Sequence, residues 1–456
     1  MRIAVVGGRL QGLEVVYLAK KAGYHTLVID KSGDVPAAGI CDRFVRFAFT
    51  PTCVVPDGCS NVDLIIPAVE DGEVLSLVEK WAQLKQISFA FDSSAYALTC
   101  SKLRSNVLFD KLHLPVPKAW PGCGFPVVVK PDQASGSQGV RLYRDAAVFR
   151  TDFPGGRIPD TMVAQQYLEG PQFSIEVVGL PGQHVPLCVT DLHMDRDHDC
   201  KQVSAPACLS PEQAAHLEEM ALALAEAIDL KGIMDVEVIL HEGDLKLLEI
   251  DARFPSQTPM AVYWAAGINM VQLLAEQFVP GHAACKKRVK NPADLLPYPG
   301  QALDHTAAKY KLAHGQDPEM VSGQLQDRKL SPGQPPFRWV VVEHIQAGPD
   351  SIRFLGEHIM GLAGPLGLEP GFFGCHDALT NYGTHRSCWV ATLIFCADNQ
   401  KDLAAARNTC YKQIRKNLCR SGKNAGNQPK AMQDQDLPAT KNFGQGNQNH
   451  DPAAAR

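Results

Sequence analysis

The stretch IMDVEVILHEGDLKLLEIDAR, residues 233–253, decides the fold of this chain. Two apolar runs, 233–240 and 245–251, flank a short polar turn that contains Gly243, which is typical of a β-hairpin. Even positions of the first run are all apolar and form a core face, because side chains alternate between the two faces of a strand. The sequence therefore predicts an antiparallel hairpin with one buried face.

The opposite face of this hairpin carries acids. Asp235 and Glu237 stand at odd positions of the first run. Glu249 and Asp251, two residues apart in the second run, share one face. Carboxylates this close repel each other unless a cation compensates, and Mg²⁺ binds carboxylates together with substrate phosphates. The pattern favours a magnesium site over a solvated polar sheet face, and Arg253, on the same alternation, is placed to bind a phosphate or a developing oxyanion.

A second feature lies upstream, where an apolar strand at 126–130 ends in Lys130. Residues 131–139 form a loop of small and polar side chains, whose backbone N–H groups suit phosphate binding. The chain contains no GxxxxGK[ST] motif and therefore no P-loop. The loop indicates either a phosphate-binding segment or a structural hairpin turn, and the sequence leaves both open.

The N-terminal residues alternate between strands and helices. Apolar strands are expected at 2–6, 25–29 and 62–67, with helices after the first and the third. This alternation predicts a parallel sheet with right-handed crossovers, and hence a Rossmann-like domain over residues 1–91.

The loop after the first strand is a test for a dinucleotide site. The fingerprint needs glycines at offsets zero, two and five, and these positions hold Gly7, Arg9 and Gly12. Because the middle glycine is missing, the loop favours a tight strand-to-helix turn over an NAD site. Arg9 and Gln11 stand at the carboxyl ends of strands, where open α/β sheets bind ligands, and are candidate substrate contacts.

Composition limits the function classes. The net charge of −5 gives no reason to expect nucleic acid or an anionic membrane as a partner. No run of about 18 apolar residues is present, so we expect a cytoplasmic protein. Residues 419–456 are polar and contain almost no large apolar side chains, which predicts a disordered tail.

In chain order, these features resemble the ATP-grasp superfamily, to which D-alanine–D-alanine ligase and biotin carboxylase belong. The matching features are a helical lysine, a strand lysine with its loop, a hinge and a Glu-x-Asp-x-Arg strand, namely Lys102, Lys130, Ser137, residues 165–168, Glu249, Asp251 and Arg253. The resemblance implies an α/β and α+β fold. Its parts are a Rossmann-like domain at 1–91, an ATP-grasp domain at 92–282 and a small C-terminal domain at 283–418, before the tail at 419–456.

The resemblance also implies roles for site residues. Lys102 and Lys130 are expected to contact the phosphates and the adenine cleft of ATP, with Lys130 also catalytic. The hinge is expected to offer backbone groups to adenine from Gln165, Gln166, Tyr167 and Leu168. Two Mg²⁺ ions are expected on Glu237, Glu249 and Asp251.

Three positions depart from the family pattern. The hinge usually carries two glutamates seven residues apart, the second holding the ribose, where this chain has Gln165 and Gln172. Glutamine can still hydrogen-bond a ribose hydroxyl, so we keep Gln172 as the ribose contact. Asp251 stands where many members have asparagine, a change that preserves magnesium ligation.

A closer resemblance is to the 3-methylornithine–lysine ligase family of pyrrolysine biosynthesis. It rests on the segments 7–12, 199–201, 378–382 and 389–394. It implies that ATP drives the joining of 3-methyl-D-ornithine to the ε-amine of L-lysine through an acyl phosphate, and it suggests a homodimer.

Substrate contacts follow as expectations. In this interpretation Arg253 stabilises the oxyanion, and the residues that would hold the amino acids are Arg9, Gln11, Glu70, Glu176 and Asp235. Two alternatives stay open at this point. One is another ATP-grasp carboxylate–amine ligase of the D-alanine–D-alanine type, and the other is a non-catalytic nucleotide-binding protein.

Overall fold

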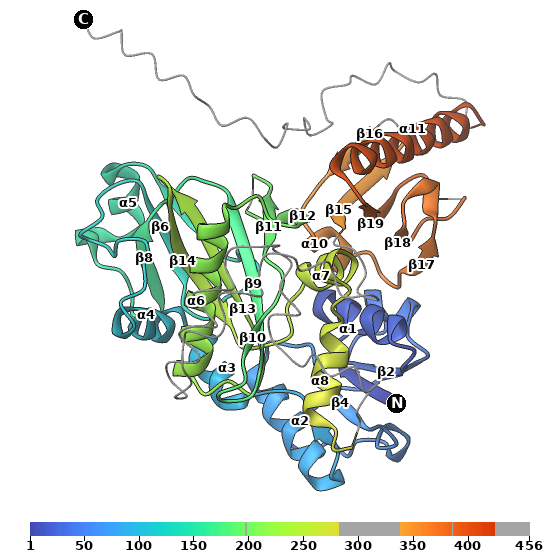
Figure 1. Cartoon of the computed structure of the whole chain (residues 1–456), viewed down its shortest axis with the longest axis horizontal. Helices are drawn as coiled ribbons and strands as arrows, with labels where there is room; N and C mark the ends of the chain where they lie inside the picture. Colours follow the sequence, from blue (N-terminus) through green and yellow to red (C-terminus); the bar gives the residue numbers. More distant parts are fainter. Residues whose placement is uncertain (197, 282–337, 350, 385, 425–456) are drawn as a thin grey trace, which may run out of the picture.

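The computed structural model of the chain describes residues 1–196, 198–281, 338–349, 351–384 and 386–424. Residues 282–337 of the predicted C-terminal domain and residues 425–456 of the predicted tail lie outside the described residues. Figure 1 shows a small sheet on the left, a large central sheet, and a parallel sheet at the lower right. This arrangement confirms the predicted α/β and α+β fold class.

The N-terminal part is a parallel sheet covered by helices. Its strands lie in the order β3-β2-β1-β4-β5, and all neighbours are parallel. The elements are β1 (Arg2–Val6), α1 (Leu10–Lys21), β2 (His25–Asp30), η1 (Pro36–Gly39), β3 (Arg43–Arg46), η2 (Asp57–Cys59), β4 (Leu64–Pro67), α2 (Gly72–Lys85) and β5 (Ser88–Phe89). Because parallel strands end at the same edge, the loops after β1 and β4 meet there, which brings Gln11 beside Glu70.

A three-stranded sheet, in the order β7-β6-β8, carries the predicted small-residue loop. Its elements, with the two helices that precede it, are α3 (Ser93–Thr99), α4 (Lys102–Lys111), β6 (Val127–Pro131), β7 (Arg141–Tyr143), α5 (Ala146–Asp152), η3 (Pro154–Gly156) and β8 (Met162–Gln166). Phe149, Phe153 and Tyr143 give this sheet a hydrophobic cluster of its own. The loop between β6 and β7 is therefore carried by a separately packed lobe.

Among the residues that the structure describes, the central sheet has eleven strands, and it crosses the predicted domain boundary at 282. The order is β14-β13-β9-β11-β12-β15-β19-β18-β17, with β10 on β9 and β16 on β15. The strands are β9 (Gln172–Gly179), β10 (Val185–Pro186), β11 (Thr190–Met194), β12 (Cys200–Ala205), β13 (Gly232–His241), β14 (Asp244–Asp251), β15 (Trp339–Gly348), β16 (Ser351–Phe354), β17 (Gly367–Pro370), β18 (Asp377–Thr380) and β19 (Trp389–Ala397). Since β12 pairs with β15, the parts expected at 92–282 and 283–418 share one sheet.

The predicted hairpin forms as β13 and β14. Its register places Asp235 opposite Asp251 and Glu237 opposite Glu249. Next to the second pair the register shifts, which leaves one extra residue, Leu248, on β14. The extra residue matters because a one-residue slip turns every following side chain to the other face. In a regular strand without this bulge, Glu249 and Asp251 would have continued the core face that Leu245 and Leu247 begin.

Helix α6 (Pro211–Ala227) covers the apolar face of this sheet. It begins at the predicted capping box, in which Gln213 N donates to Ser210 Oγ at 3.2 Å and Ser210 N donates to Gln213 Oε1 at 3.1 Å. Phe173 and Ile175 of β9 belong to the core beneath α6. Because strand residues alternate, Glu176 faces the opposite, polar side.

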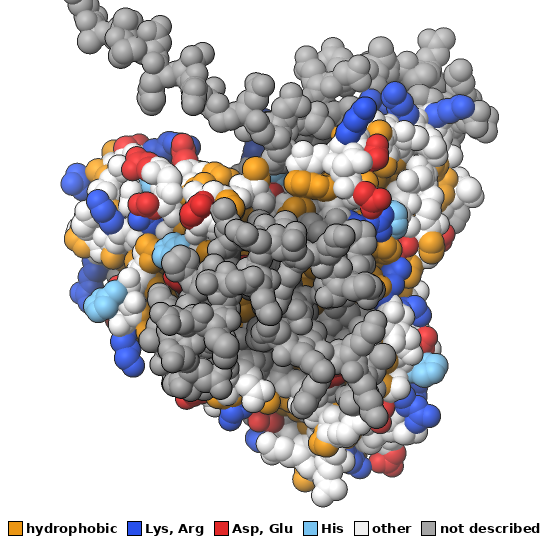
Figure 2. Space-filling view, in the orientation of Figure 1, with side chains coloured by type: hydrophobic (Ala, Val, Ile, Leu, Met, Phe, Trp, Pro, Cys, Tyr) orange, Lys and Arg blue, Asp and Glu red, His pale blue; other side chains and the backbone are white. Residues whose placement is uncertain are grey.

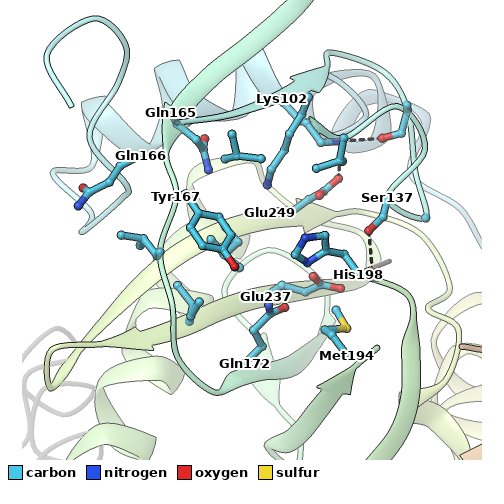
Figure 3. Close-up of a pocket in the computed structure, with 18 of the residues that line it drawn as sticks. Lys102, Ser137, Gln165, Gln166, Tyr167, Gln172, Met194, His198, Glu237 and Glu249 are labelled. Atoms are coloured by element: carbon cyan, nitrogen blue, oxygen red, sulfur yellow. Dashed lines mark hydrogen bonds and ion pairs between the residues drawn. The ribbon is translucent and has the colours of Figure 1, made fainter. Parts of the chain in front are cut away.

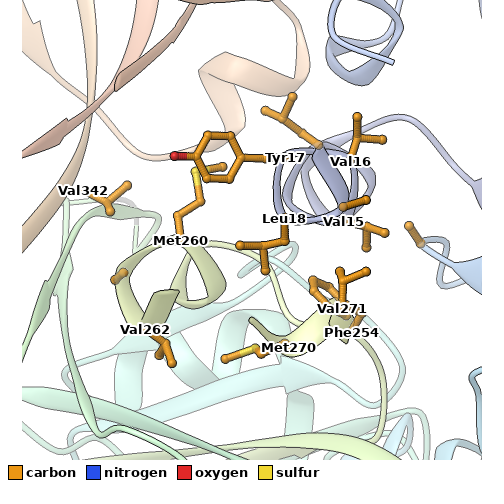
Figure 4. Packing of buried hydrophobic residues seen from close by; sticks show 14 of the residues in the cluster. Val15, Val16, Tyr17, Leu18, Phe254, Met260, Val262, Met270, Val271 and Val342 are labelled. Atoms are coloured by element: carbon orange, nitrogen blue, oxygen red, sulfur yellow. The ribbon is translucent and has the colours of Figure 1, made fainter. Parts of the chain in front are cut away.

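One hydrophobic core joins the N-terminal part to the central sheet (Figure 4). Tyr17 and Leu18 of α1 pack with Met260 of α7 (Thr258–Ala266), Val271 of α8 (Met270–Phe278) and Val342 of β15. Each fully buried side chain of this size contributes about 1.5–3 kcal/mol. This packing fixes α1, whose first turn carries a candidate substrate residue, against the sheet that carries the acids.

The C-terminal segment contains α10 (His358–Gly361), η6 (Phe372–Gly374) and α11 (Gln400–Asn424). Helix α11 packs on the central sheet through Tyr411 and Ile414. It continues to Asn424, beyond the limit of 418 that the sequence suggested for this part.

The described surface carries charges of both signs. Basic and acidic side chains are interspersed around the described rim of the face in Figure 2. Exposed ion pairs such as Lys20–Asp42 contribute little stability. No helix within the described ranges is long and apolar enough to cross a membrane.

Candidate active site

A cleft of about 350 Å³ opens between the three-stranded sheet and the β13–β14 hairpin (Figure 3). Its lining includes all the residues predicted to contact the nucleotide and two of the predicted metal ligands, namely Lys102, Lys130, Ser137, Gln165, Gln166, Tyr167, Leu168, Gln172, Glu237 and Glu249. These residues come from α4, β6, β8, β9, β13, β14 and the loops between them. The fold therefore assembles one site from segments far apart in the sequence.

Two lysines reach the acids of the hairpin. Lys102 Nζ, at the start of α4, lies 2.7 Å from Glu249 Oε1 and donates to the carbonyl of Ala134 at 2.6 Å. Lys102 thus connects the hairpin to the small-residue loop. Burial lowers the pKa of Lys130, and the carboxylate of Glu249 opposes that change. A polyanion bound in the cleft would favour the charged form of Lys130.

The small-residue loop after β6 lies against two other segments. Ser137 Oγ donates to the carbonyl of His198 at 2.8 Å. Gly136, at φ +57°, lies so close to the imidazole of His358 that a Cβ would come within 2.6 Å of Nε2. His358 Nδ1 lies 2.8 Å from Asp199 Oδ1, and this hydrogen bond raises the pKa of His358. Residues after β11 and at the start of α10 therefore hold the loop in place.

The predicted hinge lies at the end of β8. Gln166 N donates to the carbonyl of Lys118 at 2.8 Å, and Tyr167 N donates to that of Pro126 at 3.1 Å. The backbone hydrogen bonds among the described loop residues include none from Leu168 N, and Leu168 lines the cleft. Backbone recognition of a base is therefore available at Leu168, whereas two of the other hinge N–H groups are already used.

The acids of the hairpin carry an electrostatic cost. Desolvation, and then the neighbouring Glu249, raise the pKa of Glu237 to about 7. Desolvation also raises the pKa of Asp251 to about 7, although Arg253 opposes the change. A bound cation relieves such a cost because it stabilises the ionised form.

Arg253 connects these acids to the N-terminal part. Its Nη2 donates to Asp251 Oδ2 at 3.0 Å, and its Nε lies 2.8 Å from Glu70 Oε1. Gln11 Nε2 donates to the same oxygen of Glu70 at 2.8 Å. Burial disfavours the charged guanidinium, but the carboxylates of Asp251 and Glu70 keep the pKa of Arg253 above its usual value. Arg9, at the N-cap of α1, is exposed beside this chain of contacts.

Glu176 and Asp235 lie one step further along the polar face. They stand directly opposite each other in the β9–β13 pairing, next to the pair formed by Ser174 and Glu237. Glu176 is completely buried, and burial raises its pKa to about 7. Thr258 Oγ1 donates to Glu176 Oε1. Among the described residues, Glu176 Oε2 and Asp235 Oδ1 have no hydrogen-bond partner.

Comparison with known sequences identifies the family. A family model described as the ATP-grasp domain matches residues 100–257, the segment that contains the cleft. The 3-methyl-D-ornithine–L-lysine ligase of Methanosarcina mazei is 37% identical over 281 residues, which cover 61% of this chain and 72% of that ligase. The chain belongs to the ATP-grasp family. The ligase of the same name from Methanosarcina acetivorans is 35% identical and covers 61% of this chain and 74% of its own length.

A solved ATP-grasp structure confirms the fold. The ADP complex of N5-carboxyaminoimidazole ribonucleotide synthetase aligns with 90% of this chain and 96% of that chain, with a TM-score of 0.57. At 14% identity this likeness concerns the fold alone. The fold shared with that structure is therefore not confined to residues 100–257.

The ATP-grasp site also contains residues that sequence reasoning missed. Met194 and His198 line the cleft, Thr258 contacts Glu176, and His358 contacts the small-residue loop. The partner of Thr258 is 82 residues away in the sequence. Contacts over such separations leave no local pattern, so periodicity and spacing gave no signal for them.

Proposed function

We propose that this chain joins the carboxylate of 3-methyl-D-ornithine to the ε-amine of L-lysine and converts ATP to ADP and phosphate. The observation that carries the proposal is the polar face on which paired acids, two lysines and Arg253 lie together in an ATP-grasp fold. The choice of amino acids rests on the two Methanosarcina ligases, which are 37% and 35% identical to this chain. A role in pyrrolysine biosynthesis, a cytoplasmic location and a homodimer stay predictions.

In this proposal ATP lies along the cleft, from the hinge to the small-residue loop. Leu168 N–H would hold adenine at the hinge, and Gln172 would hold the ribose. The small-residue loop and both lysines would then face the phosphates. The residues assigned to ATP are Lys102, Lys130, Ser137, Gln165, Gln166, Tyr167, Leu168 and Gln172.

Two Mg²⁺ ions would be held by Glu237, Glu249 and Asp251. In the described ranges, no three His, Cys, Asp or Glu side chains are arranged to hold a metal by themselves. Mg²⁺ is usually bound through one or two carboxylates together with substrate phosphates, and the facing pair of Glu237 and Glu249 supplies those carboxylates. The ion pair of Glu249 with the Lys102 ammonium, at 2.7 Å, supports a cationic ligand at this carboxylate. When bound, the ions neutralise charge on the phosphoryl group during transfer.

The reaction has two steps. First, a carboxylate oxygen of 3-methyl-D-ornithine attacks the γ-phosphorus of ATP, the bond to the ADP oxygen breaks, and an acyl phosphate forms. Second, the neutral ε-amine of lysine attacks the acyl carbon, phosphate leaves, and the amine loses one proton. A free lysine amine has a pKa of about 10.4, so the site must favour its neutral form. The small-residue loop would exclude water, which would otherwise hydrolyse the acyl phosphate.

The remaining side chains serve the two amino acids. Arg253, held by Asp251 and Glu70, would stabilise the oxyanion of the second step. Lys130 would neutralise the transferred phosphoryl group. The residues assigned to substrate binding are Arg9, Gln11 and Glu70 from the N-terminal part, and Glu176 and Asp235 from the sheet.

The test is ADP and phosphate release with MgATP, L-lysine and D-ornithine, with mass spectrometry of the products. The proposal expects one ADP for each dipeptide linked through the ε-amine. ADP release with D-alanine pairs instead would keep the fold and the chemistry but replace the substrates. No turnover with any pair, from folded protein, would indicate a nucleotide-binding protein.

A further inference from the structure

The small-residue loop touches a residue that the proposed reaction leaves without a role, His358 of α10. A Cβ on Gly136, at φ +57°, would come within 2.6 Å of His358 Nε2 and 3.0 Å of its Cε1. The imidazole therefore lies directly against the loop backbone at this glycine. Ser137, the next residue, donates its hydroxyl to the carbonyl of His198 at 2.8 Å. The middle of the loop thus rests on two segments that lie outside its own lobe.

His358 is held by the turn between β11 and β12. Its Nδ1 lies 2.8 Å from Asp199 Oδ1, and its backbone N–H donates to Asp199 Oδ2 at 3.2 Å. Asp195 accepts the backbone N–H groups of Gly356 at 3.1 Å and of Asp199 at 3.0 Å. Gly356 lies so close to Asp199 that a Cβ there would come within 1.9 Å of the carboxylate. The two aspartates therefore fix both the backbone and the ring of His358.

The segment that carries His358 is also anchored to the rest of the molecule. Leu366 N donates to the carbonyl of Pro36 at 3.1 Å. Met360 is fully buried in the core that joins the N-terminal part to the central sheet. The small-residue loop belongs instead to the three-stranded sheet, which has a hydrophobic cluster of its own. His358 is thus a fixed point against which a separately packed lobe can close.

The groups around the ring favour its protonated form. The hydrogen bond to Asp199 raises the pKa of His358, and burial opposes this change. The charges of Asp199, Glu357 and Asp195 add to the rise. Both nitrogens of a protonated ring donate, so Nε2 presents an N–H toward the loop while Nδ1 stays bonded to Asp199. A loop that has closed around anionic phosphates is attracted to such a cation.

We propose that His358 is a positioning residue that holds the small-residue loop closed over the acyl phosphate, so that lysine and not water reaches it. The assignment rests on the proposed function and deepens it, because it names a contact that controls the partition between ligation and hydrolysis. Ligation transfers the acyl group from phosphate to the lysine nitrogen and releases phosphate and a proton. Hydrolysis transfers the acyl group to water and consumes ATP without forming the dipeptide. Because His358 acts through the loop, its loss changes this partition more than the rate of phosphoryl transfer.

The experiment measures ADP and dipeptide together in reactions with MgATP, D-ornithine and L-lysine. For His358→Ala we expect the ratio of ADP to dipeptide to rise from about 1 to about 5, with ADP release within about threefold of the wild-type rate. A merely structural loss would lower both products together and leave their ratio unchanged. His216→Ala, at an exposed histidine of α6, is the matched control and is expected to keep the wild-type ratio. An unchanged ratio in His358→Ala would overturn the proposal.

A second variant tests the contact from the loop side. Gly136→Ala places a methyl group against the imidazole of His358, and we expect it to raise the ratio about fivefold. The same methyl group meets no ring when His358 is alanine, so the double variant is expected to lie less than about 1.5-fold above His358→Ala. Effects that multiply to about 25-fold would overturn the proposal, because Gly136 would then act through its backbone conformation and not through the contact.

The contact can also be tested without turnover. Stopped-flow displacement of N-methylanthraniloyl-ADP, bound with Mg²⁺, measures how fast the closed loop releases a nucleotide. His358→Ala is expected to release it about 10-fold faster than the wild-type chain, and His216→Ala at the wild-type rate. Faster release in His358→Ala, with no dipeptide from the wild-type chain, would reject the proposed function and keep the loop contact. Equal release from the wild-type chain and His358→Ala would reject the contact, whether or not the dipeptide forms.

Discussion

The polar face of the central sheet has two ends that differ in how their carboxylates are compensated. At one end Glu249 lies 2.7 Å from the ammonium of Lys102, and Lys130 lies nearby in the same cleft. At the other end Glu176 and Asp235 keep two buried oxygens without a partner among the described residues. The chain thus supplies cations where the proposed ligand is an anionic nucleotide. At the other end the nearby cation is Arg253, which opposes the burial-driven rise of the Asp235 pKa without giving Asp235 Oδ1 a hydrogen-bond partner among the described residues.

The largest effect on activity is expected at the compensated end of the polar face, where Lys102 and Lys130 lie near Glu249. Glu249→Gln removes a metal-type carboxylate and the ion pair with Lys102, and we expect kcat to fall on the order of 1000-fold because metal charge stabilisation is lost. ADP release with saturating substrates measures it. Glu242→Gln, in the exposed turn of the same hairpin, is the matched control. Full activity of Glu249→Gln would remove this residue from the metal site.

The next effect concerns the link between the two ends. Arg253→Lys keeps a positive charge but loses the planar fork that contacts Asp251 and Glu70. We expect kcat to fall about 100-fold, the usual cost of losing an oxyanion donor, with the KM for ATP within about threefold. Steady-state kinetics in both substrates separates the two constants. A rise in the KM for ATP with kcat unchanged would assign Arg253 to nucleotide binding instead.

Much of the compensated end could be predicted from the sequence, because strand alternation is a local property. The spacing of Glu249 and Asp251 put both on one face, and the structure pairs them with Glu237 and Asp235. The extra residue at Leu248 was not predicted, although the switch of apolar positions within that strand contains the signal.

The other end of the polar face, which carries Glu176 and Asp235, was less predictable from the sequence. Glu176 was expected to contact substrate, but its neighbours Glu14 and Thr258 were not identified. Glu14 contacts the segment before α7 across 243 residues of sequence, and no periodicity encodes that separation. The pairing of β12 with β15, across the boundary expected at 282, was also not foreseen from the sequence. Sheet continuation across a sequence gap follows from packing and not from local composition.

Glu218, a buried carboxyl outside the polar face, shows how burial alone changes the pKa of a glutamate in this protein. Burial alone raises the pKa of Glu218 to about 7 from a usual value of 4.5. The folded state therefore binds more protons than the unfolded state between these values, and this group's contribution to stability is lost as pH rises from about 4.5 to 7. We expect Glu218→Gln to remove on the order of 2 kcal/mol of that pH dependence. Denaturant unfolding at pH 4.5 and 7.5 measures it, and identical pH profiles would contradict the raised pKa.

The smallest effect concerns an acid added to the compensated end. Gln172→Glu introduces the ribose-binding carboxylate expected from the family resemblance, and hydrogen bonds to a charged acceptor are about twice as strong as neutral ones. We expect ATP to bind about 5-fold more tightly, because Lys102 and Lys130 offset the added charge. Gln138→Glu, which adds the same charge elsewhere in the cleft lining, is the control, and equilibrium titration with ATP is the measurement. Weaker ATP binding in both variants would mean that Lys102 and Lys130 do not offset an added acid. The difference between the two ends of the polar face would then rest on the Lys102–Glu249 ion pair alone.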